Sequence, residues 1–78
     1  GSMKRYDLRH LGDKFLNRMG EILKNSARGE TMIFMFEMGD FSAVQKSADL
    51  VEGLNSTLLS SIRYNQVDWM IVAKKGRG

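Results

Sequence analysis

The sequence contains no cysteine, no proline and a single histidine, His10. Without cysteine the chain forms no disulfide and offers no thiolate ligand to a metal. One histidine is too few for a histidine-rich metal site, and most enzyme sites combine a nucleophile, a base and an orienting group. We therefore expect a protein that is not an enzyme and that holds neither a metal nor a cofactor.

Long hydrophobic runs are also missing. No apolar stretch approaches the roughly 18 residues that a membrane-spanning helix needs, so no membrane association is expected. The absence of cysteine is typical of a reducing compartment and favours a cytoplasmic location. Gly1 and Ser2 are interpreted as the remnant of a cleaved tag. Residues 3–78 are expected to form a single domain, with residues 75–78 as a flexible basic tail.

What the chain does carry is an uneven charge. The net charge is +3, but seven basic side chains oppose three acidic ones in residues 1–28, and two oppose six in residues 29–73. Lys74, Lys75 and Arg77 make the end basic again. A folded domain with this distribution is dipolar rather than uniformly positive.

The first half of the chain predicts a strand, a helix and a strand. Residues 4–11 suit either a half-buried strand or the start of a helix; we favour the strand, with Gly12 and Asp13 as a turn that caps the next helix. Residues 31–38 are apolar on both faces, as in an inner strand covered on both sides. Residues 14–25 are predicted to be helical because their apolar residues recur at steps of three and four: Phe15, Met19, Ile22 and Leu23.

The second half predicts a long helix and a last strand. Ser42 and Gln45 match a capping box, and apolar residues recur at helical spacing from there to about Arg63. Residues 67–74 alternate as in a strand. One face of that strand would carry Val67, Trp69, Ile71 and Ala73, and the other Asp68, Met70, Val72 and Lys74.

These elements predict an α/β (α+β) fold, a small (β)αβαβ two-layer domain with both helices mainly on one face of a three-stranded sheet. A strand–helix–strand crossover leaves its two strands parallel, so residues 31–38 and 67–74 are expected to run parallel. The other sheet face must be covered, by the N-terminal segment or by a second subunit, which favours a homodimer. The residues that we expect at such a protein interface are Ile33, Met35, Met70 and Val72.

Basic residues suggest a second kind of surface. If the N-terminal segment and the last strand end close together, a patch able to neutralise several phosphates would form. Tyr6 lies among these residues and would offer stacking to a base. The candidate nucleic-acid-binding residues are Arg5, Arg9, Lys14, Arg18, Lys74, Lys75 and Arg77.

The order of the elements and the ending from Met70 to Lys75 resemble small βαβαβ domains that bind RNA or DNA. The families meant are the C-terminal domain of bacterial translation initiation factor three and the Alba chromatin proteins. The likeness covers the arrangement and no motif, so it assigns no functional residue. Those families carry basic residues before the second helix, where this chain has Glu37 and Asp40.

Two pairs of residues offer chemical alternatives. Glu37 and Asp68 lie in predicted strands, and as neighbours one of them would have a raised pKa; pairing with a cation is the plainer interpretation. Gly39 and Asp40 precede a helix, where phosphates bind, but a tight turn is the plainer interpretation there.

Two functions follow. The first is a non-catalytic nucleic-acid-binding domain, or a regulator associated with RNA or DNA. The alternative is a protein–protein interaction module, a small adaptor or inhibitor that acts through the apolar sheet face as a dimer.

Overall fold

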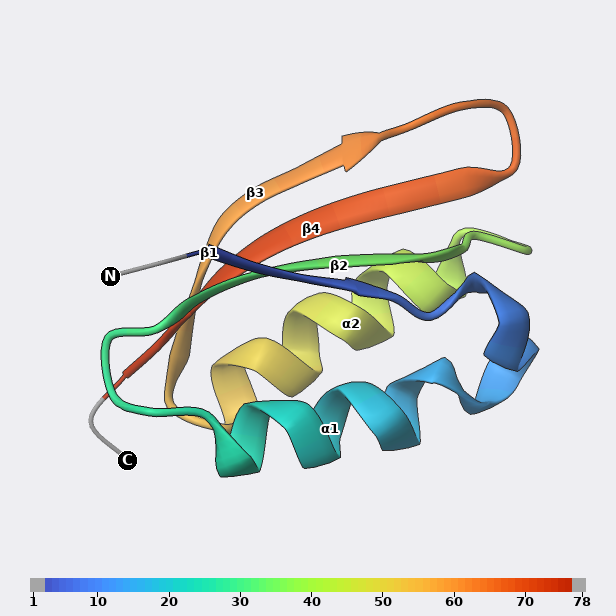
Figure 1. The fold of residues 1–78 in the computed structure, drawn as a ribbon. Coiled ribbons are helices and arrows are strands. Elements are labelled where there is room, and N and C mark those ends of the chain that lie inside the picture. Colours follow the sequence, from blue (N-terminus) through green and yellow to red (C-terminus); the bar gives the residue numbers. More distant parts are fainter. Residues whose placement is uncertain (1–2, 77–78) are drawn as a thin grey trace.

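A computed structural model describes residues 3–76. The chain forms β1 (Met3–Asp7), a 3₁₀ helix η1 (Arg9–Lys14), α1 (Phe15–Asn25), β2 (Thr31–Glu37), α2 (Ser42–Gly53), β3 (Ser56–Arg63) and β4 (Asp68–Lys75) (Figure 1). The strands make one four-stranded sheet in the order β1-β2-β4-β3. Both helices lie on the same face of that sheet (Figure 1). The two-layer α+β prediction is confirmed, and the number of strands is corrected from three to four.

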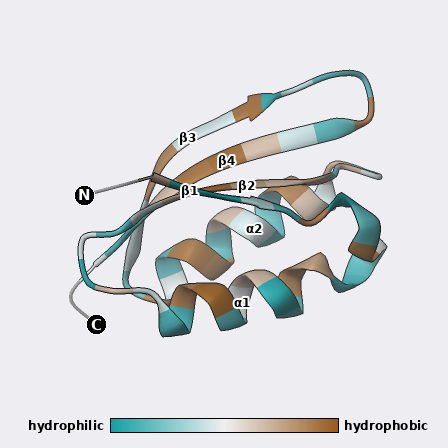
Figure 2. Ribbon diagram, in the orientation of Figure 1, coloured by the Kyte–Doolittle hydropathy of each residue, from teal (hydrophilic) through white to brown (hydrophobic). Residues whose placement is uncertain are grey.

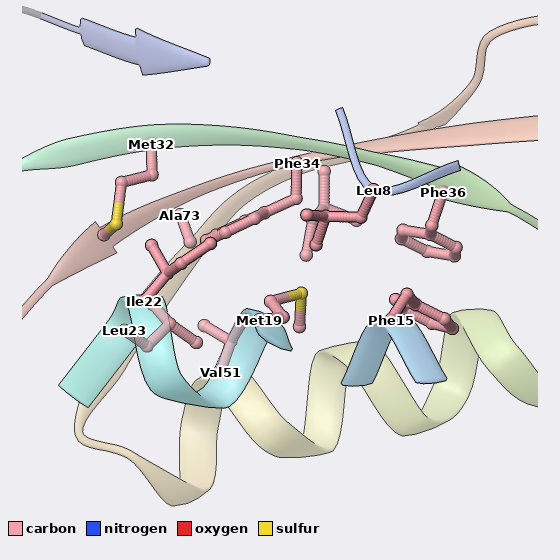
Figure 3. Packing of buried hydrophobic residues seen from close by; sticks show 11 residues of the cluster. Leu8, Phe15, Met19, Ile22, Leu23, Met32, Phe34, Phe36, Val51 and Ala73 are labelled. Carbon is pink, nitrogen blue, oxygen red and sulfur yellow. The ribbon is translucent and has the colours of Figure 1, made fainter. Parts of the chain in front are cut away.

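The core fills the space between the sheet and the two helices (Figure 3). β2 contributes every second residue, since side chains alternate between the faces of a strand: Met32, Phe34 and Phe36 are fully buried. β4 adds Ile71 and Ala73, which lie opposite Phe34 and Met32. From the helices come the stripe predicted for α1 and one residue of α2: Phe15, Met19, Ile22, Leu23 and Val51.

The two helices pack against each other where a side chain is missing. Gly20 of α1 would meet the methyl carbons of Leu50 in α2 at 3.8 Å if it carried a Cβ. This is the close approach to a neighbouring element that a glycine in a helix indicates. Neither helix in residues 3–76 has the length and apolar character needed to cross a bilayer.

The prediction of one long helix after Ser42 is wrong beyond Gly53. α2 ends at Gly53, Asn55 adopts a left-handed backbone with φ 56°, and β3 begins one residue later. The capping box is also wrong: Ser42 lies inside the helix, and its amide and hydroxyl donate to the Oδ1 of Asp40. Asp40 therefore performs the capping that the sequence pattern predicted for Ser42.

The extra strand changes how the sheet is connected. β1 and β2 are parallel, joined by the crossover through α1. β2 and β4 are antiparallel, and so are β3 and β4. The predicted parallel pairing of residues 31–38 with 67–74 is therefore wrong, because β3 returns the chain along the sheet before β4 begins.

Hydropathy follows this arrangement. β2 is hydrophobic along most of its length, whereas the connection between β3 and β4 is hydrophilic (Figure 2). A strand at the centre of a sheet has neighbours on both sides, and here helices cover one face. The other face of β2 is apolar as well, and it makes the candidate site.

Candidate functional site

The sheet face that points away from α1 and α2 is covered by no other element of residues 3–76 (Figure 1). We call it the open face. Its centre lies on the two inner strands, where Ile33 is paired with Val72 and Met35 with Met70. These four residues, named below the apolar centre, are each partly buried. The structure thus places all four predicted interface residues side by side on one surface.

Polar side chains flank the apolar centre on the two edge strands. On β1, Arg5 lies beside Ile33 and Asp7 beside Met35. On β3, Ser60 lies beside Val72 and Ile62 beside Met70. Only Ile62, with 48% of its surface exposed, extends the apolar surface onto an edge strand.

A shallow depression of about 430 Å³ follows the boundary between this apolar centre and β1. Ile33, Met35 and Met70 form its floor, and Arg5 and Tyr64 belong to its lining. Tyr64 is 55% exposed. The open face therefore combines an apolar floor with an aromatic ring and a cation at the rim, a combination typical of surfaces that bind proteins.

The ends of the open face differ in charge. Lys74 lies opposite Thr31 at the beginning of β2, one position from the row of Arg5. Glu37 stands at the other end of β2. All three charged side chains are exposed, and none forms a salt bridge with another side chain of residues 3–76. The open face is therefore positive at one end and negative at the other.

Arg9 connects the end of β1 to the beginning of β4. Its guanidinium lies 2.7 Å from Asp7 Oδ2 and 3.2 Å from Asp68 Oδ2. Asp68 is 5% exposed and also accepts from the Asn65 amide at 2.9 Å. The hydrogen bonds from Arg9 lower the pKa of Asp7 to about 2. The two carboxylates thus hold Arg9 in the protein and neutralise it.

The predicted nucleic-acid residues do not come together as one patch. Arg5 and Lys74 share the open face, whereas Lys14 and Arg18 belong to the helix layer on the opposite side. Arg18 also pairs with Glu21 at 3.4 Å. Tyr6 stacks on Phe34 with ring centres 5.5 Å apart, so it faces the core.

The predicted basic tail is corrected at its first residue. Lys75 belongs to β4, is 9% exposed and donates from Nζ to the Leu23 carbonyl oxygen at 2.6 Å. That carbonyl lies in the last turn of α1, where backbone oxygens lack helical partners. The lysine therefore caps a helix and is not available to a phosphate. Arg77 lies outside the described residues.

The two chemical alternatives resolve into structural roles. Glu37 and Asp68 are paired across β2 and β4 as neighbours, but Asp68 is held by Arg9, which is the plainer interpretation. Asp40 accepts the Ser42 amide at 2.9 Å, a turn whose hydrogen bonds lower the pKa of Asp40. Within residues 3–76 no group of three or more histidine, aspartate or glutamate side chains is placed to hold a metal.

Sequence reasoning missed the part of the open face that β3 supplies. Ile62 and Tyr64 were predicted to lie in a helix and at its end, and their alternation with Arg63 was the only available signal. The bulge between Leu58 and Ser60 obscures that signal, because it shifts the alternation of the strand by one residue.

Comparison with known proteins places the chain among relatives. The family described as the E subunit of a putative NADH-ubiquinone oxidoreductase matches residues 3–75. The solution structure of HP1264 from Helicobacter pylori is 45% identical, has a TM-score of 0.72, and is matched over 96% of this chain and 100% of its own. No curated protein matches the sequence.

Proposed function

We propose that this protein, which belongs to the family of the putative NADH-ubiquinone oxidoreductase E subunit, is a non-catalytic subunit that binds another protein of such an assembly through its open face. One observation carries the proposal. The apolar centre of Ile33, Met35, Met70 and Val72 lies on a face that no element of residues 3–76 covers. Soluble domains rarely leave contiguous apolar patches exposed unless these bind something.

The chemistry of the chain supports a structural rather than an electron-carrying role. Iron–sulfur clusters are held mainly by cysteine thiolates, and the 78 residues include no cysteine. The same absence, together with the reducing conditions that it favours, leads us to propose that the subunit works in the cytoplasm. Its contribution to an oxidoreductase would then be to complete or position a neighbouring subunit.

Met70→Asp tests the proposal directly. An aspartate in the middle of an interface leaves a charge without a partner in a desolvated position, and central interface residues commonly contribute about 2 kcal/mol or more. We expect the variant to bind the purified hydrophilic subunits of the oxidoreductase from the same organism at least about 30-fold more weakly. Isothermal titration against each subunit measures the change.

Val67→Asp is the matched control. Val67 is 60% exposed and precedes β4 on the side of Trp69, which faces the helices. The same substitution there introduces the same charge outside the open face, so binding is expected to stay within about 2-fold. Equal losses in the two variants, or no binding by the unmodified chain, would refute the proposal.

Nucleic-acid binding is the second candidate, favoured by one observation. Arg5 and Lys74 stand near the same end of the open face, which also carries the exposed ring of Tyr64. Replacing both cations with glutamine should reduce the salt dependence of binding to single-stranded RNA. The slope of log K against log salt is expected to fall by about 1.4, which is about 0.7 for each lost phosphate contact.

Fluorescence anisotropy with a labelled oligonucleotide between roughly 50 and 200 mM salt, the range over which such effects are large, gives that slope. Lys14 and Arg18 lie on the opposite side of the molecule, and their replacement by glutamine is the control. An unchanged slope in the Arg5 and Lys74 variant, with a reduced slope in the control, would rule out the open face as a nucleic-acid site.

A further inference from the structure

The width of the apolar centre limits what can cover the open face. The apolar centre occupies the two inner strands, whereas the edge strands present Arg5 and Asp7 on β1 and Ser60 on β3. Two strands about 4.8 Å apart, with their side chains, make an apolar band about 10 Å wide. That is the width of one α-helix, about 10–12 Å. A second sheet packed face to face would instead place its own strands over the polar side chains of both edges.

The charges at the two ends give the covering segment a direction. Arg5 and Lys74 lie near the beginning of β2 and favour acidic residues above them, and Glu37 at its end favours basic residues. Helices carry acidic side chains most favourably in the first turn and basic ones in the last, because of the helix dipole. A helix that meets both requirements begins above Thr31 and ends above Glu37, so it runs parallel to β2.

The length of β2 sets the length of that helix. β2 has seven residues, and a strand rises about 3.3 Å per residue, which gives about 20–23 Å. A helix rises about 1.5 Å per residue, so about 14 residues span the same distance.

Resting on the proposed function, we infer that the partner seated on the open face is one amphipathic helix of about 14 residues. Its apolar stripe lies on Ile33, Met35, Met70 and Val72. Its acidic first turn lies over Arg5 and Lys74, and its basic last turn over Glu37. The observation that names this partner is an apolar band one helix wide with opposite unpaired charges at its two ends.

Two synthetic peptides test this with the full chain. Both carry leucines at helical spacing; one has glutamates in the first turn and lysines in the last, and the other has these charges exchanged. The proteins are the unmodified chain and a charge-exchanged variant, Arg5→Glu with Glu37→Lys and Lys74→Glu. All three positions are exposed, so the variant should fold, and circular dichroism checks that it does. Fluorescence anisotropy of the labelled peptides gives the four affinities.

We expect the unmodified chain to prefer the first peptide, and the preference ratio to shift by about 10-fold or more toward the second peptide in the variant. Exposed ion pairs give about 2- to 5-fold each, and the comparison of ratios cancels any difference in helicity between the peptides. An unchanged ratio would overturn the inferred direction. Equal affinity for a peptide with two interior prolines, which cannot be helical, would overturn the helix.

A second copy of the chain is the competing occupant. Light scattering that gave twice the 8.9 kDa chain mass, returning to one chain mass in Met70→Asp, would replace the helix by a dimer. Failure of the peptides while Met70→Asp still abolishes binding of an oxidoreductase subunit would refute the helix alone. Peptide binding in the expected order, without binding of any such subunit, would refute the proposed function alone.

Discussion

Replacing Phe34 with alanine is expected to lower the free energy of unfolding by about 3–5 kcal/mol. Phe34 is fully buried at the centre of β2, between β1 and β4, and its ring stacks on Tyr6. Removing it leaves a cavity that the sheet and helices cannot close, because both are fixed by their own hydrogen bonds. Domains this small have total stabilities near the low end of about 5–15 kcal/mol, so much of the variant should be unfolded.

Urea denaturation followed by the fluorescence of Trp69, which is the only tryptophan, measures the change. Leu59→Ala is the control. Leu59 is the extra residue of the β3 bulge and is 54% exposed, so its loss is expected to cost no more than about 0.5–1 kcal/mol. If both variants lost the same free energy, the core would not lie between β2 and the helices.

The inner strands could be predicted from the sequence because their burial alternates strongly. Phe34 is inaccessible while the neighbouring Ile33 and Met35 are only partly buried, and period-two alternation in a short run is the signature of a strand. The stretch from Asp68 to Lys75 behaves in the same way. For this reason the open face and its four apolar residues could be assigned before the pairing of the strands was known.

The second half of the predicted long helix could not be assigned correctly, for a geometric reason. Residues four apart share a face in a helix and also in a strand, so the spacing of Leu54, Leu58 and Ile62 fits both. The signals that separate the two are Gly53 and Asn55, which are residues typical of helix ends. Asn55 adopts the left-handed conformation that ends α2. Treating Gly53 as a tolerated defect removed a strand from the predicted sheet.

The roles of the charged residues could not be predicted, because they depend on contacts that are distant in sequence. Arg9 meets Asp68 across 59 positions, and Lys75 meets Leu23 across 52. A composition that counts these cations as free overestimates the positive surface. What remains free on the open face is Arg5 and Lys74, which is why the geometry favours protein binding over nucleic-acid binding.

The Arg9 network gives the second large effect. Arg9→Met removes the cation from Asp68, whose side chain is only 8% exposed, and leaves a nearly buried carboxylate with the Asn65 amide as its remaining side-chain donor. A buried charge without its partner destabilises more than the pair itself stabilises. We expect the melting temperature at pH 7 to fall by about 5–10 °C, as for the loss of one hydrogen-bonded charge in a domain of this size. Differential scanning calorimetry measures it.

The double variant Arg9→Met with Asp68→Asn separates charge from shape. Asparagine keeps a carbonyl oxygen for Asn65 but carries no charge, so the double variant should recover at least half of the lost melting temperature, roughly 3–5 °C. Additive losses in the two single variants would show that Arg9 and Asp68 are not coupled.

Acid adds an independent readout of the same contact. In the folded chain the hydrogen bonds from Arg9 hold the pKa of Asp7 at about 2, below its ordinary value of 3.8. A carboxylate with a lowered pKa stabilises the fold above its unfolded value and loses that contribution as the pH falls through its folded value. The difference in melting temperature between the unmodified chain and Arg9→Met should therefore shrink between about pH 4 and pH 2. A difference that stayed constant down to about pH 2 would mean that Arg9 does not hold these carboxylates in the folded protein, and that its charge is free on the open face.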